Sequence, residues 1–423
     1  MDAERSSWNT SPVYDILSFI GDSKERDLKS YINMIKQKTI YLDFQASTPL
    51  RPEALTAMMP YFSELYGNPH SNDHIKGWES NKAVENGRQK IADAINADKD
   101  EIIFTSGATE ANNMVLKGLE KHLQDANKKT IIVSSIEHKC VLESAAFLKE
   151  RGFKIVHVRP NSEGIVSKDA LEDTINDDVG LVSVMLVNNE IGTIQPVKEL
   201  AEVTHKYGAL FHTDAAQASV FMNLDVDQLS VDFMSLSSHK AYGPKGIGAL
   251  YICGDYKDAL KPLIHGGGQE DGLRSGTLPT ALCVGMGEAI EFCAHQSASN
   301  ARKLNTLSHD FMNKIKRSIP EVSLNGSKTF RHPGSLNIAF PGIKSSHFLQ
   351  SLQPDVAAST GSACNSGIEN PSYVLAEIGL DRDKAESSIR FSFGIDQTAE
   401  EIRKAADIIS KVYRQQAAVV FAV

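Results

Sequence analysis

The chain alternates short apolar runs, rich in β-branched residues, with amphipathic helical patterns, and this alternation constrains its fold most strongly. The runs that we expect to form strands are Glu101–Ser106, Thr130–Ser134, Lys154–Val158, Leu181–Val187, Leu210–Thr213, Phe233–Leu236 and Ala249–Ile252. The helical patterns among them are Asn81–Ala97, Glu110–Leu123, Cys140–Arg151 and Val197–Tyr207. Nearly continuous apolar strands separated by helices are typical of a mostly parallel sheet with helices on both faces. The sequence therefore predicts an α/β fold.

The pattern changes near residue 297, where a helix over Ser299–Ser318 is expected to stop just before Ile319-Pro320 because of the proline. Short strands, Ser335–Phe340 and Ser388–Ser392, and a final helix, Ala399–Val412, follow. We interpret this part as a smaller α+β domain. The predicted division is an N-terminal extension over 1–39, a small domain formed by 40–52 and 298–423, and a large domain over 53–297.

The composition is that of an ordinary globular protein and excludes several function classes. The 423 residues are 41% hydrophobic and 23% charged, and the net charge of −9 argues against general nucleic-acid or membrane-surface binding. No apolar run approaches the roughly 18 residues of a membrane span. The N-terminus carries several acidic residues and has no charged-then-apolar pattern, so we expect no leader. The five cysteines form no C-x-x-C pair, so we expect neither a disulfide framework nor a metal site. A cytoplasmic setting follows as the expectation.

Three polar residues near the ends of predicted strands suit one cofactor. Lys240 lies in the segment Ser237-Ser238-His239-Lys240, Asp214 follows the strand that ends at Thr213, and Gln217 comes three residues later. Pyridoxal phosphate needs an amine for its aldehyde, an anion for its ring nitrogen and a donor for its phenolate oxygen. Ligands of parallel sheets bind outside the carboxyl ends of strands, where these residues fall. The ordinary alternatives are a solvated loop lysine and an aspartate that caps a helix.

Two further motifs fit the same ligand. Ser106-Gly107-Ala108-Thr109 opens a helix, where free backbone N–H groups and the helix dipole bind phosphate, although a simple turn with Thr109 as N-cap would look alike. His138 follows a strand and could stack on a flat ring and shuttle protons, or it could be a satisfied core histidine.

An arginine and a glycine-rich loop indicate anion binding. Arg390 lies inside an apolar strand and needs a partner, either a substrate carboxylate or a structural ion pair. The loop Gly266-Gly267-Gly268-Gln269-Glu270 is followed by Arg274 and is expected to wrap an anion.

One cysteine differs from the rest. Cys364 lies in a polar loop among glycine and serine residues, and a reactive thiol requires such exposure. The other four, Cys140, Cys253, Cys283 and Cys293, fall in apolar or helical patterns and are interpreted as buried filler.

Together these motifs resemble the cysteine desulfurases of the NifS/IscS type, which are class V aminotransferase-like, fold-type I pyridoxal phosphate enzymes. The resemblance covers the chain from about Tyr41 to near its C-terminus. Its most specific motifs are Ser237-x-His239-Lys240-x-Tyr242-Gly243-Pro244-Lys245-Gly246, Gly266-Gly267-Gly268-Gln269-Glu270-x-Gly272-x-Arg274-Ser275-Gly276-Thr277 and Gly361-Ser362-Ala363-Cys364. The segment Asp43-Phe44-Gln45-Ala46-Ser47-Thr48-Pro49 varies the usual Asp-x-Ala-Ala-Thr-Thr-Pro.

The resemblance implies a role for each motif. Lys240 would bind the cofactor aldehyde, Asp214 the ring nitrogen and Gln217 the phenolate, while His138 would stack on the ring. The phosphate would be held by Gly107, Ala108, Thr109, Ser237 and His239, with Thr277 arriving from the second subunit of a homodimer. Asn189 and Arg390 would grip the substrate carboxylate, and Cys364 would accept the sulfur.

The implied reaction converts L-cysteine to L-alanine and leaves a persulfide on the enzyme. An acceptor protein would then collect the sulfur for iron–sulfur cluster assembly or for tRNA or DNA modification. Two alternatives stay open: a selenocysteine lyase or another class V enzyme such as a transaminase, and a non-catalytic scaffold for sulfur-transfer partners.

Overall fold

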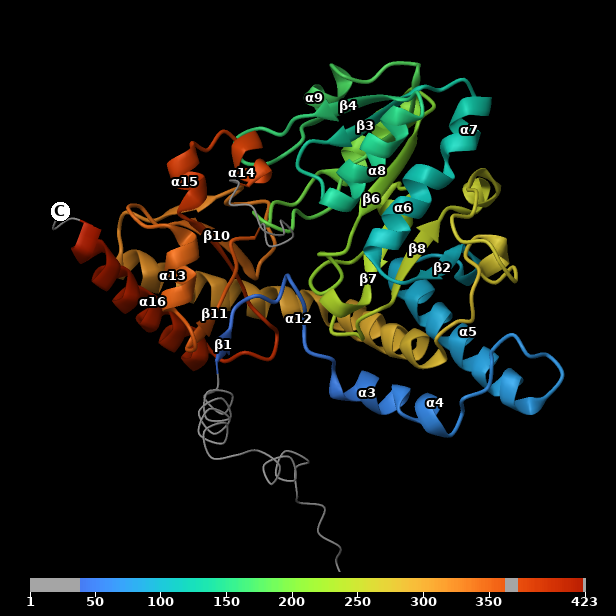
Figure 1. The fold of residues 1–423 in the computed structure, drawn as a ribbon, viewed down its shortest axis with the longest axis horizontal. Helices are drawn as coiled ribbons and strands as arrows, with labels where there is room; N and C mark the ends of the chain where they lie inside the picture. Colours follow the sequence, from blue (N-terminus) through green and yellow to red (C-terminus); the bar gives the residue numbers. More distant parts are fainter. Residues whose placement is uncertain (1–38, 362–371, 421–423) are drawn as a thin grey trace, which may run out of the picture.

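The computed structural model describes residues 39–361 and 372–420, and its largest feature is a seven-stranded sheet (Figure 1). The strand order is β2-β8-β7-β6-β5-β3-β4, and every neighbouring pair is parallel except the two that β8 forms with β2 and β7. The predicted mostly parallel sheet is therefore confirmed. Its strands are β2 (Ile102–Thr105), β3 (Thr130–Ser134), β4 (Lys154–Val158), β5 (Val179–Ser183), β6 (Leu210–Asp214), β7 (Phe233–Ser237) and β8 (Gly248–Ile252).

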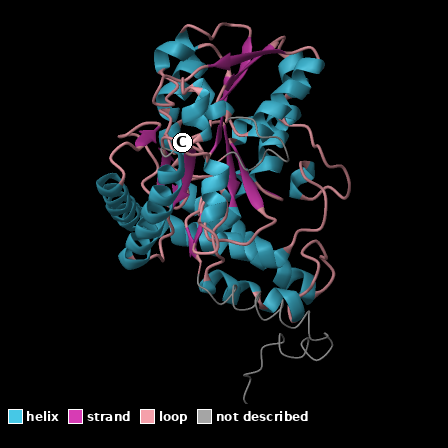
Figure 2. Ribbon diagram, turned by 60° about the vertical axis from the view of Figure 1, so that its left-hand side comes forward, coloured by secondary structure: helices cyan, strands magenta, loops and turns pink. Residues whose placement is uncertain are grey.

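Helices cover both faces of this sheet because alternate strand residues point to opposite sides (Figure 2). Ile103, Val133 and Leu181 pack with residues of α6 and α8, whereas Phe104 and Ile132 pack into the core that α5, α10 and α12 share. The main helices are α5 (Ile75–Ile95), α6 (Ala108–Gly118), α8 (Lys139–Glu150), α10 (Val197–Lys206) and α12 (Thr280–Ser318). Shorter ones are α3 (Pro52–Met58), α4 (Pro60–Ser63), α7 (Glu120–Asp125), α9 (Lys168–Glu172) and α11 (Val226–Leu229).

A second, smaller group of elements packs beside the large sheet. Strand β10 lies between β12 and β9 and is antiparallel to both, and β1 pairs in parallel with β11. These strands are β1 (Ile40–Tyr41), β9 (Ser323–Asn325), β10 (Ser335–Ala339), β11 (Val356–Ala357) and β12 (Ser388–Ser392). The helices are α13 (Ser345–Ser351), α14 (Tyr373–Glu377), α15 (Arg382–Glu386) and α16 (Ala399–Val420).

Helix α12 runs along both groups of elements (Figure 1) and begins at Thr280, well before the expected start at Ser299. Its first turns contain Gly285 and Gly287, which lower helix propensity. A Cβ on Gly287 would stand 2.7 Å from Cα of Gly87 in α5, so the two helices pack through their glycines. The helix crosses the predicted boundary at residue 297, and the division into domains stays a prediction.

Other boundaries differ by smaller amounts. The helix expected over Glu110–Leu123 is broken at Leu119 into α6 and α7, and the strand expected over Leu181–Val187 is assigned as Val179–Ser183. None of the helices within the described ranges is long and apolar enough to cross a membrane. Residues 1–38 lie outside the described part of the chain.

Candidate active site

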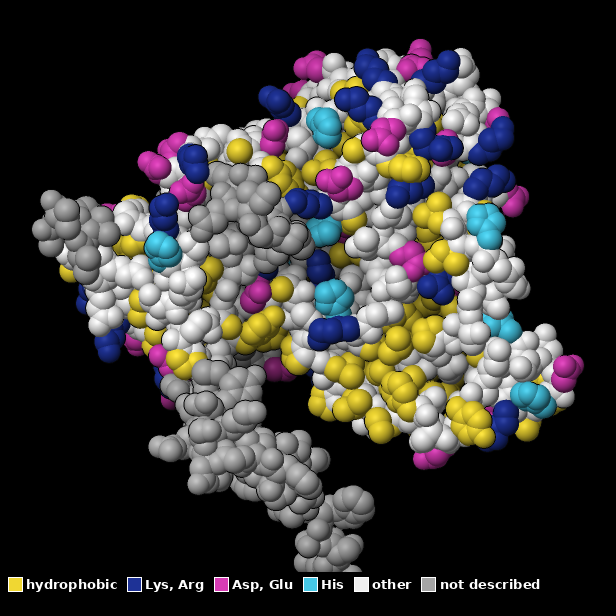
Figure 3. All heavy atoms as spheres, viewed as in Figure 1, with side chains coloured by type: hydrophobic (Ala, Val, Ile, Leu, Met, Phe, Trp, Pro, Cys, Tyr) yellow, Lys and Arg dark blue, Asp and Glu magenta, His cyan; other side chains and the backbone are white. Residues whose placement is uncertain are grey.

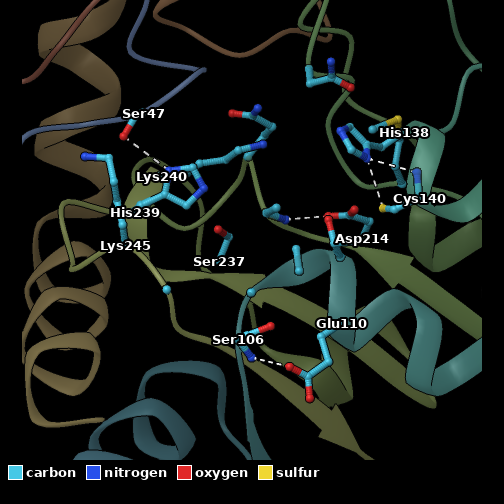
Figure 4. Close-up of a pocket in the computed structure, with 18 residues that line it drawn as sticks. Ser47, Ser106, Glu110, His138, Cys140, Asp214, Ser237, His239, Lys240 and Lys245 are labelled. Atoms are coloured by element: carbon cyan, nitrogen blue, oxygen red, sulfur yellow. Dashed lines mark hydrogen bonds between the residues drawn. The ribbon is translucent and has the colours of Figure 1, made fainter. Parts of the chain in front are cut away.

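A pocket of about 370 Å³ opens at the carboxyl ends of the parallel strands (Figure 4). Figure 3 shows histidine and basic side chains gathered in a hollow on one face of the molecule. Ten of the predicted site residues line this pocket: Gly107, Ala108, Thr109, His138, Asn189, Asp214, Gln217, Ser237, His239 and Lys240. Lys245, which was not predicted as a site residue, lines it too. The sheet therefore brings segments more than a hundred residues apart to one place.

Asp214 and Lys240 sit at the ends of adjacent strands. Asp214 is the last residue of β6 and is only 5% exposed, and Lys240 lies in the short turn Ser238–Lys240 that follows β7. The carboxylate accepts hydrogen bonds from Nδ2 of Asn112 (2.6 Å) and from the backbone N–H of Ala216 (2.9 Å). Gln217, also buried, donates through Nε2 to the carbonyl oxygen of Gln45 (3.0 Å). A buried carboxylate held by neutral donors is suited to a cationic ring nitrogen.

The start of α6 also lines the pocket. Gly107 is its N-cap, has a φ of 152° and supplies no side-chain cap, so the first N–H groups of the helix face the pocket without one. A Cβ on Gly248 would stand 2.6 Å from Cα of Gly107, so the turn approaches the sheet closely. Ser237, His239 and Lys245 line the same pocket. Helix N–H groups, a hydroxyl and a lysine are the donors that a phosphate needs, and the residues therefore fit pyridoxal phosphate.

Burial keeps the two histidines of the pocket neutral. Burial lowers the pKa of His138, and nearby Lys240 and Lys139 lower it further, whereas Asp214 opposes the shift. The pKa of His239 falls to about 4 through burial and the charges of Lys240 and Lys245. At neutral pH both rings therefore carry one proton and can either donate or accept a hydrogen bond.

Arg390 is held behind the pocket and does not line it. The side chain is 4% exposed; its Nη2 lies 2.5 Å from Oδ1 of Asp43, and its Nη1 donates to the carbonyl oxygen of Asn189 (2.6 Å). Its Nε has no hydrogen-bond partner among the described residues. The ion pair that the sequence left open is thus present, and Arg390 also supports Asn189, which does line the pocket.

Two other residues that were expected to bind an anion, Thr277 and Arg274, do not line this pocket. Thr277 is exposed and does not line the pocket. Arg274, expected to bind an anion with its glycine-rich loop, instead donates through Nε to Oε1 of Glu110 (2.8 Å). The other oxygen of Glu110 accepts the N–H of Ser106 (2.7 Å). The loop therefore fastens the start of α6 from within the same chain.

Cys364 lies outside the described residues. For the other four cysteines burial raises the pKa of the thiol, to about 12 for Cys140 and Cys293. These four thiols are therefore protonated at neutral pH and are poor nucleophiles. Cys140 was expected to be buried filler, but it lines the pocket. The signal that could have indicated this is its position two residues after His138 in the sequence.

Glu190 is a buried carboxyl group that sequence reasoning assigned no role. It is 2% exposed, and burial raises its pKa to about 7 against the opposing effects of a hydrogen bond from Ser372 and the charge of Arg390. A Cβ on Gly361 would stand 2.7 Å from its Cγ. Glu190 therefore contacts the residues on both sides of the segment 362–371, which the structure does not describe.

Comparison with known proteins identifies the family. Residues 40–404 match the aminotransferase class-V family. The chain belongs to this family. A mitosomal cysteine desulfurase from Trachipleistophora hominis is 46% identical over 87% of this chain and 84% of its own length. The solved structure of a NifS-like protein is 34% identical with a TM-score of 0.83, covering 89% of this chain and all of that one. A structure of SspA in complex with cysteine is 39% identical with a TM-score of 0.74, covering 84% of this chain and 98% of that one.

These comparisons confirm the resemblance to cysteine desulfurases and the fold-type I architecture. They do not bear on the individual site residues, whose roles stay predictions.

Proposed function

We propose that this chain is a pyridoxal phosphate-dependent cysteine desulfurase, which converts L-cysteine to L-alanine and takes the sulfur onto Cys364 as a persulfide. The proposal is carried by one observation: Lys240, buried Asp214 and neutral His138 line the same pocket as a helix start that has no side-chain cap. The close relatedness to cysteine desulfurases supports the same activity.

Several of the lining residues have a task in this reaction. Bound pyridoxal phosphate supplies an aldehyde for the substrate amine and a ring that stores electrons released from Cα. Asp214 would pair with the protonated ring nitrogen and Gln217 would donate to the phenolate. Gly107, Ala108, Thr109, Ser237 and His239 would hold the phosphate with Lys245. The amine of Lys240 would bind the aldehyde and, when free, would accept the proton of Cα.

The sulfur transfer balances without an external oxidant. The Cys364 thiolate forms an S–S bond with the substrate sulfur while the Cβ–S bond breaks, and the electron pair left on Cβ takes up a proton to give alanine. L-cysteine and a thiol thus give L-alanine and a persulfide. A reductant or an acceptor protein is needed only to remove the sulfur. The protonated state of the four described thiols leaves Cys364 as the candidate nucleophile.

Replacing Arg390 tests the substrate grip. With pyridoxal phosphate and a thiol reductant, the wild type should release alanine and sulfide from L-cysteine in equal amounts. Arg390→Ala should raise KM for cysteine at least tenfold, because losing a charged pair that leaves its partner buried costs about 2–5 kcal/mol. Steady-state alanine release and cofactor titration measure the two effects separately.

Asp43→Asn is the matched control, since it breaks the ion pair of Arg390 but keeps the guanidinium. It should change KM much less than Arg390→Ala does. Equal increases in KM for both variants would show that Arg390 has a purely structural role. A wild-type protein that releases no alanine from L-cysteine would contradict the proposed activity itself.

We further propose that the site is completed in a homodimer. Large apolar side chains are exposed together on α3, α4, the start of α5 and the connections between them (Figure 3), namely Leu55, Met59, Phe62, Tyr66, Ile75 and Trp78. An apolar patch of this kind is typical of a protein interface. Thr277 is exposed and does not line the pocket of its own chain. In a homodimer its hydroxyl would instead reach the phosphate bound in the pocket of the other subunit.

Phe62→Glu is expected to shift the protein from two chains to one and to weaken cofactor binding at least tenfold. The physical reason is the cost of burying an unpaired charge in the interface, which removes Thr277 from the partner's site. Phe330→Glu is the control, because Phe330 is equally exposed but lies elsewhere. Sedimentation of both variants decides: a dimeric Phe62→Glu protein would contradict this interface.

The acceptor of the sulfur is a protein of iron–sulfur assembly or of tRNA or DNA sulfur modification. The cytoplasmic setting stays a prediction, alongside a relative whose name places it in mitosomes. A selenocysteine lyase or a transaminase and a non-catalytic scaffold are the alternatives; the pocket with Lys240 and Asp214 favours an enzyme over a scaffold.

A further inference from the structure

A chain of hydrogen bonds joins Asp214 to His138 through two residues that the reaction does not use. Asn112, fully buried on α6, directs Nδ2 to Oδ2 of Asp214 (2.6 Å) and also to Sγ of Cys140 (3.1 Å). Sγ of Cys140 lies 3.0 Å from Nδ1 of His138 (Figure 4). The links run from the carboxylate at the end of β6 to the imidazole at the start of α8.

The direction of each link follows from what the groups can donate. An amide nitrogen only donates, and its two hydrogens suffice for Asp214 and Cys140. His138 is the N-cap of α8, and its Nδ1 accepts the backbone N–H of Cys140 (3.3 Å), so this nitrogen carries the lone pair. Burial keeps the Cys140 thiol protonated by raising its pKa to about 12, and its S–H can therefore donate to Nδ1.

The geometry at Asn112 shows that its two donors decide its orientation. Its Oδ1 is buried without a hydrogen-bond partner in the described ranges. Leaving a buried acceptor unpaired destabilises the folded state. The two hydrogen bonds that Nδ2 donates, to Asp214 and to Cys140, offset this cost. An apolar residue that only filled the space would have no unpaired acceptor to compensate.

We propose that Cys140, supported by Asn112, is a positioning residue that holds neutral His138 in the tautomer with its proton on Nε2. The inference rests on the proposed function. In this tautomer Nε2 can donate a proton to the site, whereas the ring's lone pair, on Nδ1, is occupied by Cys140. His138 therefore gives a proton and Lys240 acts as the base. The two proton-transfer tasks are thereby assigned to different residues.

Solid-state ¹⁵N NMR of the holoenzyme labelled at histidine tests the tautomer directly, with His138→Gln identifying the signals. At neutral pH we expect His138 to show a bare Nδ1 and a protonated Nε2. Cys140→Ala should give a mixture of tautomers and reduce kcat about two- to tenfold, the value of one hydrogen bond. Cys140→Ser, whose hydroxyl can also donate to Nδ1, should restore the single tautomer and most of kcat.

Cys283→Ala is the matched control, since Cys283 is a buried thiol of α12 that does not line the pocket, and this variant should behave as the wild type. A protonated Nδ1 in the wild type would overturn the inference, even if no variant folded. So would a Cys140→Ala enzyme with unchanged tautomer and kcat. If the proposed function itself fails, the wild type releases no alanine whatever its tautomer, and the two failures are therefore distinguishable.

Discussion

Lys240→Ala is expected to lower alanine release at least about a thousandfold and to abolish the yellow colour of covalently attached pyridoxal phosphate. The variant loses both the amine that binds the aldehyde and the base that moves the Cα proton, and a single general base contributes about 10²–10⁴-fold. The fold should persist, because the turn around Lys240 is held by its backbone: the N–H of Thr48 donates to the carbonyl oxygen of His239 (2.9 Å). Single-turnover alanine release and the visible spectrum measure the effect.

Lys245→Ala supplies the matched control, since Lys245 lines the same pocket and is proposed to hold the phosphate rather than the aldehyde. Its loss should weaken cofactor affinity while saturating cofactor restores most of the turnover. A Lys240→Ala enzyme that releases alanine at the native rate, or a Lys245→Ala enzyme that loses the yellow colour at saturating cofactor, would show that the two lysines have been assigned wrongly.

Cys364→Ser should bind the cofactor normally but form no persulfide, and sulfide release should fall to the background rate. A serine hydroxyl is far less acidic and less nucleophilic toward sulfur than a thiol, so the S–S bond cannot form. Mass spectrometry of the wild type, after cysteine and before reductant, should find one added sulfur atom on Cys364.

Cys253→Ser serves for comparison, because burial raises the pKa of Cys253 and its thiol is protonated at neutral pH. This variant should keep both persulfide and sulfide release. Sulfur found on Cys140, Cys253, Cys283 or Cys293 of the wild type would remove Cys364 from the mechanism and place the nucleophile in the described part of the chain.

The strands and most of the site could be predicted from local sequence. β3 and β4 have the predicted bounds. In β3 all five residues are buried, as expected for an apolar run in the middle of a sheet, whereas β4 is an edge strand in which Lys154 and His157 are exposed. Asp214 and Ser237 are the last residues of their strands, each of which runs one residue further than expected. The topology of a parallel sheet then places such ends along one edge. Residue type and position relative to the strands were therefore sufficient to predict that Lys240, Asp214 and His138 line one pocket.

Contacts between distant segments decided the rest. The first turns of α12 were missed because Gly285 and Gly287 weaken a helix locally, whereas packing against Gly87 of α5 makes the absence of a Cβ necessary there. Arg274 pairs with Glu110, Arg390 with Asp43, and Cys140 with His138 and Asn112. Local residue patterns were enough to predict the fold class and the chemistry that the motifs can supply. The pairing of the buried polar groups could be known only from the folded chain, because it depends on distances between residues far apart in the sequence.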